Sequence, residues 1–195
     1  MKKLNYTEWG HPILARKMKF LSKAQIKSKR IQSLIEDMMF TIREGGVGLA
    51  ANQVGKDMHM AVMTIPANHN GGVKIPDTAI INSKILEYSK KKVKGWEACM
   101  SCPGVRGLAT RSEWVKVSYL DGNANKHIEK FTDFPAIAFQ HEIDHLNGIR
   151  YAERIEDMKN LVTNGEYGRR HLPAIIAKMK REHEKNGKKL SWKKK

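Results

Sequence analysis

The chain has 195 residues, a length that suits one domain of ordinary size, and its 41% hydrophobic and 29% charged residues are typical of a globular protein. Its 36 Lys and Arg residues against 20 Asp and Glu residues give a formal net charge of +16, which favours polyanionic partners. Two cysteines are too few for a disulfide-framed secreted domain, and no apolar run approaches the ~18 residues of a membrane span. We therefore expect a cytoplasmic protein, with an organelle as the alternative.

The first predicted element is an amphipathic helix over residues 22–43, where apolar side chains recur every three or four positions. Ser22 and Gln25 have the spacing of a capping box at its start, and the Gly45-Gly46 pair suits its end. The alternation of polar and apolar residues and the turn at Asp121-Gly122-Asn123 then predict a sheet that includes a hairpin. The expected strands cover residues 58–65, 78–86, 114–120 and 127–131.

A second helix is predicted from near Asp133 to Gly148, with Pro135 in its first turn, where proline is tolerated. A last helical segment over residues 173–184 precedes a lysine-rich tail. No internal repeat or linker marks a second domain.

The second predicted helix carries the run His141-Glu142-Ile143-Asp144-His145. Two histidines four residues apart project from one face of a helix and can bind one metal ion. Glu142 can accept a proton from water at that metal without being a ligand itself. The same short pattern also arises on ordinary exposed helices, so it needs support from other segments.

Cys99 is the candidate third ligand, because a catalytic zinc-type centre takes three protein ligands and leaves one position open. A thiolate and two neutral imidazoles leave a divalent ion with net positive charge, which lowers the pKa of a bound water. A zinc-finger knot that includes Cys102 is disfavoured, since 38 residues separate Cys102 from His141, against roughly 12 to 15 in a finger. A redox Cys-x-x-Cys pair is also disfavoured, because no thioredoxin-like strand-to-helix context surrounds the two cysteines.

A third block, residues 46–55, reads Gly-Val-Gly-Leu-Ala-Ala-Asn-Gln-Val-Gly. It is too glycine-rich and apolar for an exposed linker, which indicates close backbone packing. It is not a phosphate-binding loop, because it follows a helix and no Lys-Ser or Lys-Thr comes after it. The amide of Gln53, in an apolar stretch, suits polarisation of a substrate carbonyl.

Together the three blocks resemble the signature blocks of the peptide deformylase family, in matching order and at similar spacing. The resemblance extends from about Gly10 to Met158. The glycine-alanine block conforms to the family pattern throughout, whereas the cysteine block departs from it at Ala98, Met100 and Cys102. The family residues retained in the cysteine block are Glu97, Cys99, Ser101 and Pro103.

The resemblance implies a metal-dependent hydrolase that removes the formyl group from the N-terminal formylmethionine of new polypeptides and releases formate. The expected fold class is α+β: one domain in which antiparallel or mixed β-sheets pack around a central metal-binding helix, with an N-terminal helix and a C-terminal helical segment. Residues 1–170 would form the catalytic part. Residues 171–195 would be a basic helix and tail of the same domain.

The roles of individual residues also follow from the resemblance. The metal ligands would be Cys99, His141 and His145. Glu142 would be the general acid and base, and Gln53 with the backbone N–H of Met100 would form the oxyanion hole. Gly48 and Leu49 would border the bound peptide, and Arg106 would contact it. The apolar pocket for the methionine side chain would be lined by Val47, Phe134, Ile137 and Ala138.

The implied cofactor is one divalent ion, iron(II) natively, with zinc, nickel or cobalt also accepted by such a donor set. The substrate would be an N-formylmethionyl peptide that emerges from the ribosome. The basic segment 172–195 would bind ribosomal RNA through phosphate contacts.

Two other functions use part of the same pattern. A zincin-like metallopeptidase would need Glu153 or Glu166 as third ligand, and it would leave the cysteine and glutamine blocks unexplained. A non-enzymatic RNA-binding module would rest on the +16 charge and the basic tail alone. RNA binding and enzymatic activity do not exclude each other in one protein.

Overall fold

A computed structural model describes residues 1–43, 45–67 and 74–185. It contains a five-stranded antiparallel sheet in the order β1-β2-β3-β6-β7 and a three-stranded antiparallel sheet in the order β4-β5-β8. The strands are β1 (Gly48–Ala50), β2 (Met60–Ile65), β3 (Ile75–Tyr88), β4 (Lys92–Cys99), β5 (Cys102–Ser112), β6 (Trp114–Leu120), β7 (Lys126–Thr132) and β8 (Leu161–Thr163). The helices are α1 (Lys23–Ile26), α2 (Lys29–Ile42), α3 (Asp133–Leu146), α4 (Asn164–Glu166) and α5 (Leu172–Lys185).

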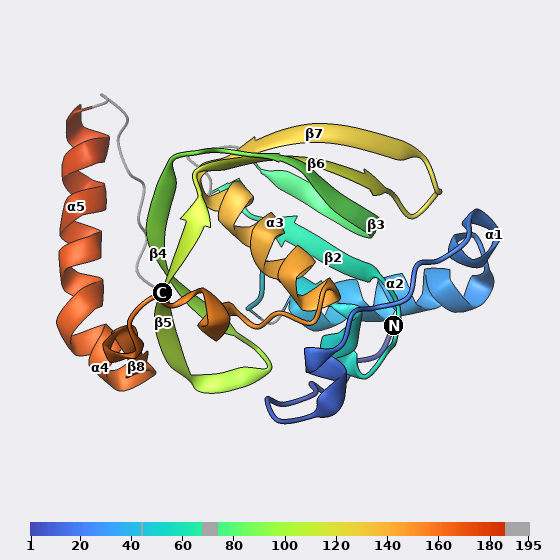
Figure 1. The fold of residues 1–195 in the computed structure, drawn as a ribbon, viewed down its shortest axis with the longest axis horizontal. Helices are drawn as coiled ribbons and strands as arrows, with labels where there is room; N and C mark the ends of the chain where they lie inside the picture. The colour runs from blue at the N-terminus through green and yellow to red at the C-terminus, as the bar shows by residue number, and fades with distance from the viewer. Residues whose placement is uncertain (44, 68–73, 186–195) are drawn as a thin grey trace.

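The helix α3 lies at the centre of the molecule, between the two sheets (Figure 1). This arrangement confirms the expected α+β class with antiparallel sheets and a C-terminal helical segment. No helix among the described residues is long and apolar enough to cross a membrane.

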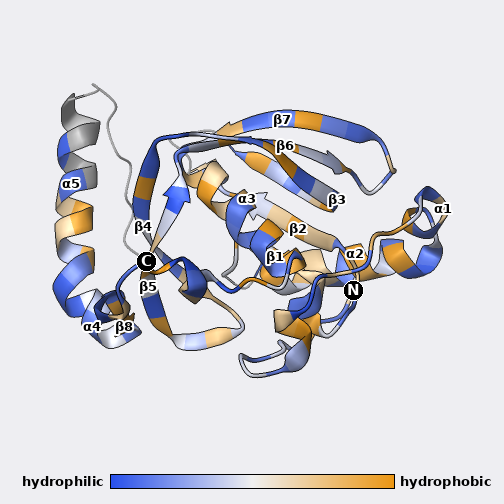
Figure 2. Ribbon diagram, viewed as in Figure 1, coloured by the Kyte–Doolittle hydropathy of each residue, from blue (hydrophilic) through white to orange (hydrophobic). Residues whose placement is uncertain are grey.

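The large sheet is buried on both faces around β2. Ala61 and Met63 belong to the core between the sheet and α3, whereas Met60 and Val62 belong to the core between the sheet and α2. A strand covered on both sides needs a continuous apolar run in place of strict alternation, and Figure 2 shows β2 as largely hydrophobic. The sheet thereby holds α2 and α3 in fixed positions.

The first predicted helix is interrupted, which corrects the single helix expected over residues 22–43. The capping box of Ser22 and Gln25 is present and starts α1. Ser28 then begins a second helix, because its Oγ accepts a hydrogen bond from the Ile31 N–H at 3.4 Å and donates one to the Gln25 carbonyl at 2.6 Å. A serine inside an apolar pattern therefore caps a new helix.

The second predicted helix is confirmed as α3, which follows β7 without a loop. The hairpin of β6 and β7 is also present, with Tyr119 opposite His127. The sequence analysis did not predict β4 and β5, which form a hairpin with Met100 and Ser101 at its turn. This hairpin places Cys99 at the end of a strand, beside α3.

The C-terminal part is one continuous helical segment after a short strand. The strand β8 pairs with β5, and α4 continues through a single π-helical turn, Tyr167–His171, into α5. Figure 1 shows α5 beyond the β4–β5 hairpin, on the side away from α3.

Candidate metal centre

Cys99, His141 and His145 converge on one point, with one ligand atom from each within 4.8 Å of the others. The His145 Nε2 lies 3.2 Å from the Cys99 Sγ and 3.2 Å from the His141 Nε2. Ligands around a tetrahedral zinc-type ion would be separated by roughly 3.3 to 3.6 Å, given metal–nitrogen and metal–sulfur bonds of about 2.0 and 2.3 Å. The donor set and its spacing fit a divalent metal ion.

The orientation of His141 is set by a carboxylate. Its Nδ1 lies 2.8 Å from the Glu97 Oε2, which leaves Nε2 to face the other two ligands. A carboxylate partner of this kind fixes the ring and makes the metal-facing nitrogen a better ligand. Burial lowers the pKa of His145 well below its usual value, so that imidazole stays neutral, as a metal ligand requires.

A chain of ion-paired side chains lies beside the metal ligands. Arg111, which is only 3% exposed, donates to both oxygens of Glu97 at 2.7 and 2.9 Å and also bonds to Asp144. Arg154 completes the chain with two bonds to Asp144 at 2.9 and 2.7 Å. Three elements, β4, β5 and α3, are thereby joined beside the metal ligands.

This chain determines the charge of Glu97. Burial alone would raise the pKa of its carboxyl, but hydrogen bonds from Arg111 and His141 outweigh burial and hold that pKa near 2. The carboxylate is therefore ionised and can keep accepting from His141 throughout the physiological pH range.

Gln53 points its amide at the ligand cluster. Its Oε1 accepts from the Ala50 N–H at 2.8 Å, which turns the NH₂ group toward the Cys99 Sγ and the Ser101 Oγ, each at 3.3 Å. The side chain is 2% exposed. A donor held in this way by the backbone is already oriented toward any group that enters the site.

Glu142 is buried next to the ligands, and its Oε2 has no hydrogen-bond partner among the described residues. Burial raises the pKa of Glu142 to about 7. The backbone of Gly48 lies directly against it: a Cβ at this position would be 2.5 Å from the Glu142 Oε1. Glycine is required there because no larger residue leaves room for the carboxylate.

The residues expected at the substrate come from both sides of the large sheet and from the β4–β5 hairpin. Val47 and Phe134 pack on the core that contains Ala138, whereas the Ile137 Cδ1 faces Gly95 of β4. Leu49 is fully buried on the α2 side of the sheet. Met100 and Arg106 lie on the β4–β5 hairpin, Met100 at its turn and Arg106 within β5. Three of the four pocket candidates therefore belong to, or pack against, the same core.

Sequence reasoning gave no role to Glu97, Arg111 or Asp144. Glu97 stands two residues before Cys99, and Asp144 lies within the histidine motif. Their closeness in sequence to the metal ligands was the signal that could have indicated a role at the site. Arg111 had none, because only the pairing of β4 with β5 brings it to the site.

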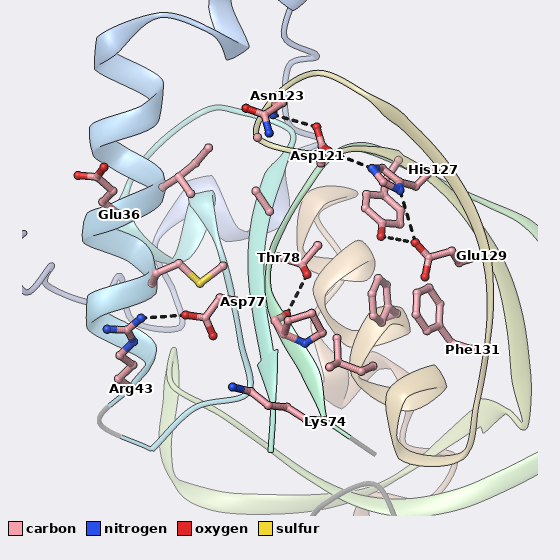
Figure 3. Close-up of a pocket in the computed structure, with 18 of the residues that line it drawn as sticks. Glu36, Arg43, Lys74, Asp77, Thr78, Asp121, Asn123, His127, Glu129 and Phe131 are labelled. Atoms are coloured by element: carbon pink, nitrogen blue, oxygen red, sulfur yellow. Dashed lines mark hydrogen bonds and ion pairs between the residues drawn. The ribbon is translucent and has the colours of Figure 1, made fainter. Parts of the chain in front are cut away.

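A cavity of about 800 Å³ opens elsewhere, between α2, β3 and the β6–β7 hairpin (Figure 3). None of the residues expected at the site lines it. Two pairs of polar side chains lie on its wall, Arg43 with Asp77 at 2.8 Å and His127 with Asp121 at 3.0 Å. The functional site is thus indicated by converging ligand atoms, not by cavity volume.

Comparisons with known proteins agree with this geometry. The sequence model of the polypeptide deformylase family matches residues 3–161. Peptide deformylase 2 of Nostoc sp. is 37% identical over 161 residues, which is 81% of this chain and 89% of the relative. The Met-Ala-Ser-bound class I type b peptide deformylase of Acinetobacter baumannii superposes with a TM-score of 0.74 at 34% identity, covering 78% of this chain and 98% of that one.

A second solved structure, the peptide deformylase of Thermotoga maritima, has a TM-score of 0.71 at 31% identity and covers 80% of this chain and all of its own length. Both the extent of the family match and the level of identity exceed what a shared fold alone would give. The chain belongs to the peptide deformylase family.

Proposed function

We propose that this chain hydrolyses the formyl group from N-formylmethionyl peptides and releases formate. The observation that carries the proposal is the convergence of a Cys-His-His ligand set with a buried, unpartnered carboxylate, Glu142, one residue from a ligand. The solved relative with bound Met-Ala-Ser supports the same substrate class, because that tripeptide is a deformylation product.

The bound peptide would lie between two free strand edges. β1 is the edge of the large sheet and β4 the edge of the small one, and the Cβ position of Gly46 is 3.5 Å from the Met100 side chain. Val47 accepts from the Thr64 N–H of β2, so the N–H and C=O of the next residue, Gly48, point away from β2. An extended peptide can pair with such an edge.

The residues then have separate tasks in the reaction. Glu142 takes a proton from the attacking water and returns it to the departing amine. The Gln53 amide and the Met100 N–H stabilise the negative charge that develops on the formyl oxygen. A metal ion held by Cys99, His141 and His145 would supply a Lewis acid that lowers the pKa of water. Val47, Phe134, Ile137 and Ala138 would enclose the methionine side chain, and Leu49 and Arg106 would border the peptide.

Iron(II) is our proposal for the native ion, with zinc, nickel and cobalt as ions that the same donors accept. Metal analysis of protein purified without oxygen tests this. We expect iron close to one equivalent per chain, and zinc as the only metal under those conditions would contradict it.

The metallopeptidase alternative is disfavoured by the surroundings of its required third ligand. Glu153 is paired with Arg150, and Glu166 with Arg169 and Arg170. Neither belongs to the metal-ligand cluster found among the described residues. Incubating the enzyme with formyl-Met-Ala-Ser and with an unblocked peptide decides the matter: we expect formate from the first and no cleavage of the second. Cleavage of the internal bond alone would overturn the deformylase assignment.

The basic C-terminal segment is proposed as a contact to ribosomal RNA, which would place the enzyme where its substrate emerges, in the cytoplasm. Residues 171–195 would then be a binding helix and tail added to a catalytic part, residues 1–170. The side chains of Arg169 and Arg170, immediately before this segment, are 70% and 76% exposed. Residues 186–195, which hold many of the tail lysines, lie outside the described residues.

Cosedimentation with ribosomes tests the RNA contact. Truncation after Asn164, or a full-length variant with Arg169→Glu and Arg170→Glu, should weaken binding, and binding of the unaltered chain should fall steeply with salt because phosphate contacts release counterions. Unchanged cosedimentation of the truncated chain would remove the ribosome contact from the account.

A further inference from the structure

The chain continues beyond the part that matches its family, and this continuation packs against the substrate side of the fold. The family match ends at residue 161, and the solved relatives align over nearly their full length with about four fifths of this chain. Beyond that point β8 pairs with β5, with Val162 opposite Arg106. The added segment therefore begins at the arginine expected to contact the peptide.

A ring of the added segment covers Arg106. The Arg106 Cζ lies 4.8 Å from the centroid of the Tyr167 ring, which is within the range of a cation–π contact. Tyr167 in turn meets Trp96 of β4 edge-on at 5.4 Å, and His171 lies 4.5 Å from Trp96. Tyr167 is thus held in place by its own neighbours.

The donors of Arg106 remain available for a ligand. No hydrogen bond or salt bridge joins its guanidinium to any residue in the described part of the chain, and its contact with Tyr167 occupies a face and leaves the N–H edge open. A half-buried arginine without an acceptor is suited to receive carbonyl oxygens from a bound molecule.

Arg106 also lies close to the ligand Cys99 in the pairing of β4 with β5. In the β4–β5 pair it stands between Gly107, which is opposite Glu97, and Cys102, which is opposite the ligand Cys99. The pairing of β4 with β5 is irregular between Glu97 and Cys99, where Ala98 is exposed and has only a methyl side chain, and β4 is an edge strand of the small sheet. The arginine side chain is long enough to cross this strand to a peptide that lies along its edge.

We propose that Tyr167 is a positioning residue for the peptide: it holds the Arg106 guanidinium against the groove, and the added C-terminal segment forms the wall that recognises residues following the methionine. This inference rests on the proposed function. Stacking restricts the rotamers of Arg106 before the substrate arrives, so its benefit falls on peptide binding and not on the chemical step.

The test compares two substrates, formyl-Met-Ala-Ser and formyl-methionine amide, which lacks the following residues. For Tyr167→Ala we expect the ratio of the tripeptide KM to the amide KM to rise about three- to tenfold, the equivalent of a cation–π contact, with kcat for the tripeptide retained. Tyr167→Phe keeps the ring and should restore the original ratio. Met158→Ala, just before β8 and 58% exposed, is the control and should leave the ratio unaltered.

A double variant separates positioning from folding. In an Arg106→Ala background, Tyr167→Ala should have no further effect on the KM ratio, and a full additional effect would overturn the proposal. An unaltered ratio in Tyr167→Ala, or an equal rise in KM for both substrates, would also overturn it while leaving deformylation intact. Failure of the unaltered enzyme to release formate from either substrate would instead refute the proposed function.

Discussion

At the scale of single residues, Gly48 connects the glycine-alanine block to the proposed acid-base residue Glu142. Its missing side chain lets Glu142 approach the edge of β1, where a peptide would pair. The motif therefore combines an open strand edge with space for the acid-base residue. Sequence alone indicated close packing here, but not which side chain required it.

The change Gly48→Ala tests this interpretation. The new methyl group would meet the Glu142 carboxylate at 2.5 Å, so we expect kcat/KM to fall by at least tenfold as the carboxylate moves. Gly46→Ala is the control, because its Cβ would have ordinary contacts, the nearest at 3.5 Å. Equal activities of the two variants in a formate-release assay would contradict the steric account.

His59 gives the fold a pH dependence that does not involve the metal centre. It is 1% exposed, its ring contacts the Phe20 ring at a tilt of 44°, and Lys17 and Lys84 lie nearby. Burial lowers the pKa of His59 from 6.5 to about 4. Between these values the unfolded chain binds a proton that the folded chain does not, so the free energy of unfolding decreases as the pH falls through this window.

Replacing His59 by glutamine should remove this contribution. We expect the loss of unfolding free energy between pH 7 and pH 4 to be smaller in His59→Gln than in the unaltered chain by about 3 kcal/mol. Urea denaturation at a series of pH values measures it. Parallel curves for the two proteins would show that His59 titrates normally.

At the scale of elements, the buried chain from Glu97 through Arg111 to Asp144 fastens β4 and β5 to α3. These charged residues occupy inward positions that would be apolar in an ordinary sheet. The same substitution of charge for apolar residues explains why β4 and β5 were not predicted from alternation. The charged residues of β4 and β5 hold these strands beside the metal ligands, and for this reason the strands lack a simple apolar alternation.

Arg111→Met should therefore cost far more than the loss of a surface ion pair. Glu97 and Asp144 would lose a buried partner, so we expect a destabilisation of about 3–5 kcal/mol and weaker metal retention. Arg43→Ala, which breaks the exposed pair with Asp77, should cost less than about 1 kcal/mol. Thermal unfolding of both variants gives the comparison, and similar losses would contradict a special role for the buried chain.

At the scale of the whole molecule, the sequence was informative where a local pattern matched a local structure. Pro135 near its start, Gly148 after its end and the spacing of its histidines predicted α3 and two ligands, and the hairpin of β6 and β7 followed from its turn. The break at Ser28 was missed because a cap competes with helix periodicity, and only the structure decides between them. The contact of Arg111 with Glu97 and that of Tyr167 with Arg106 were not predicted from the sequence. The first depends on the pairing of β4 with β5, and the second on the packing of the C-terminal segment against β5.

The central claim is that Glu142 moves protons beside a metal held by Cys99, His141 and His145, and one paired measurement on Glu142→Gln tests it most directly. Metal content and formate release from formyl-Met-Ala-Ser should be determined on the same preparation. The account predicts a full metal equivalent with kcat reduced about 100- to 10,000-fold. Turnover within a few-fold of the unaltered enzyme, with metal retained, would contradict it.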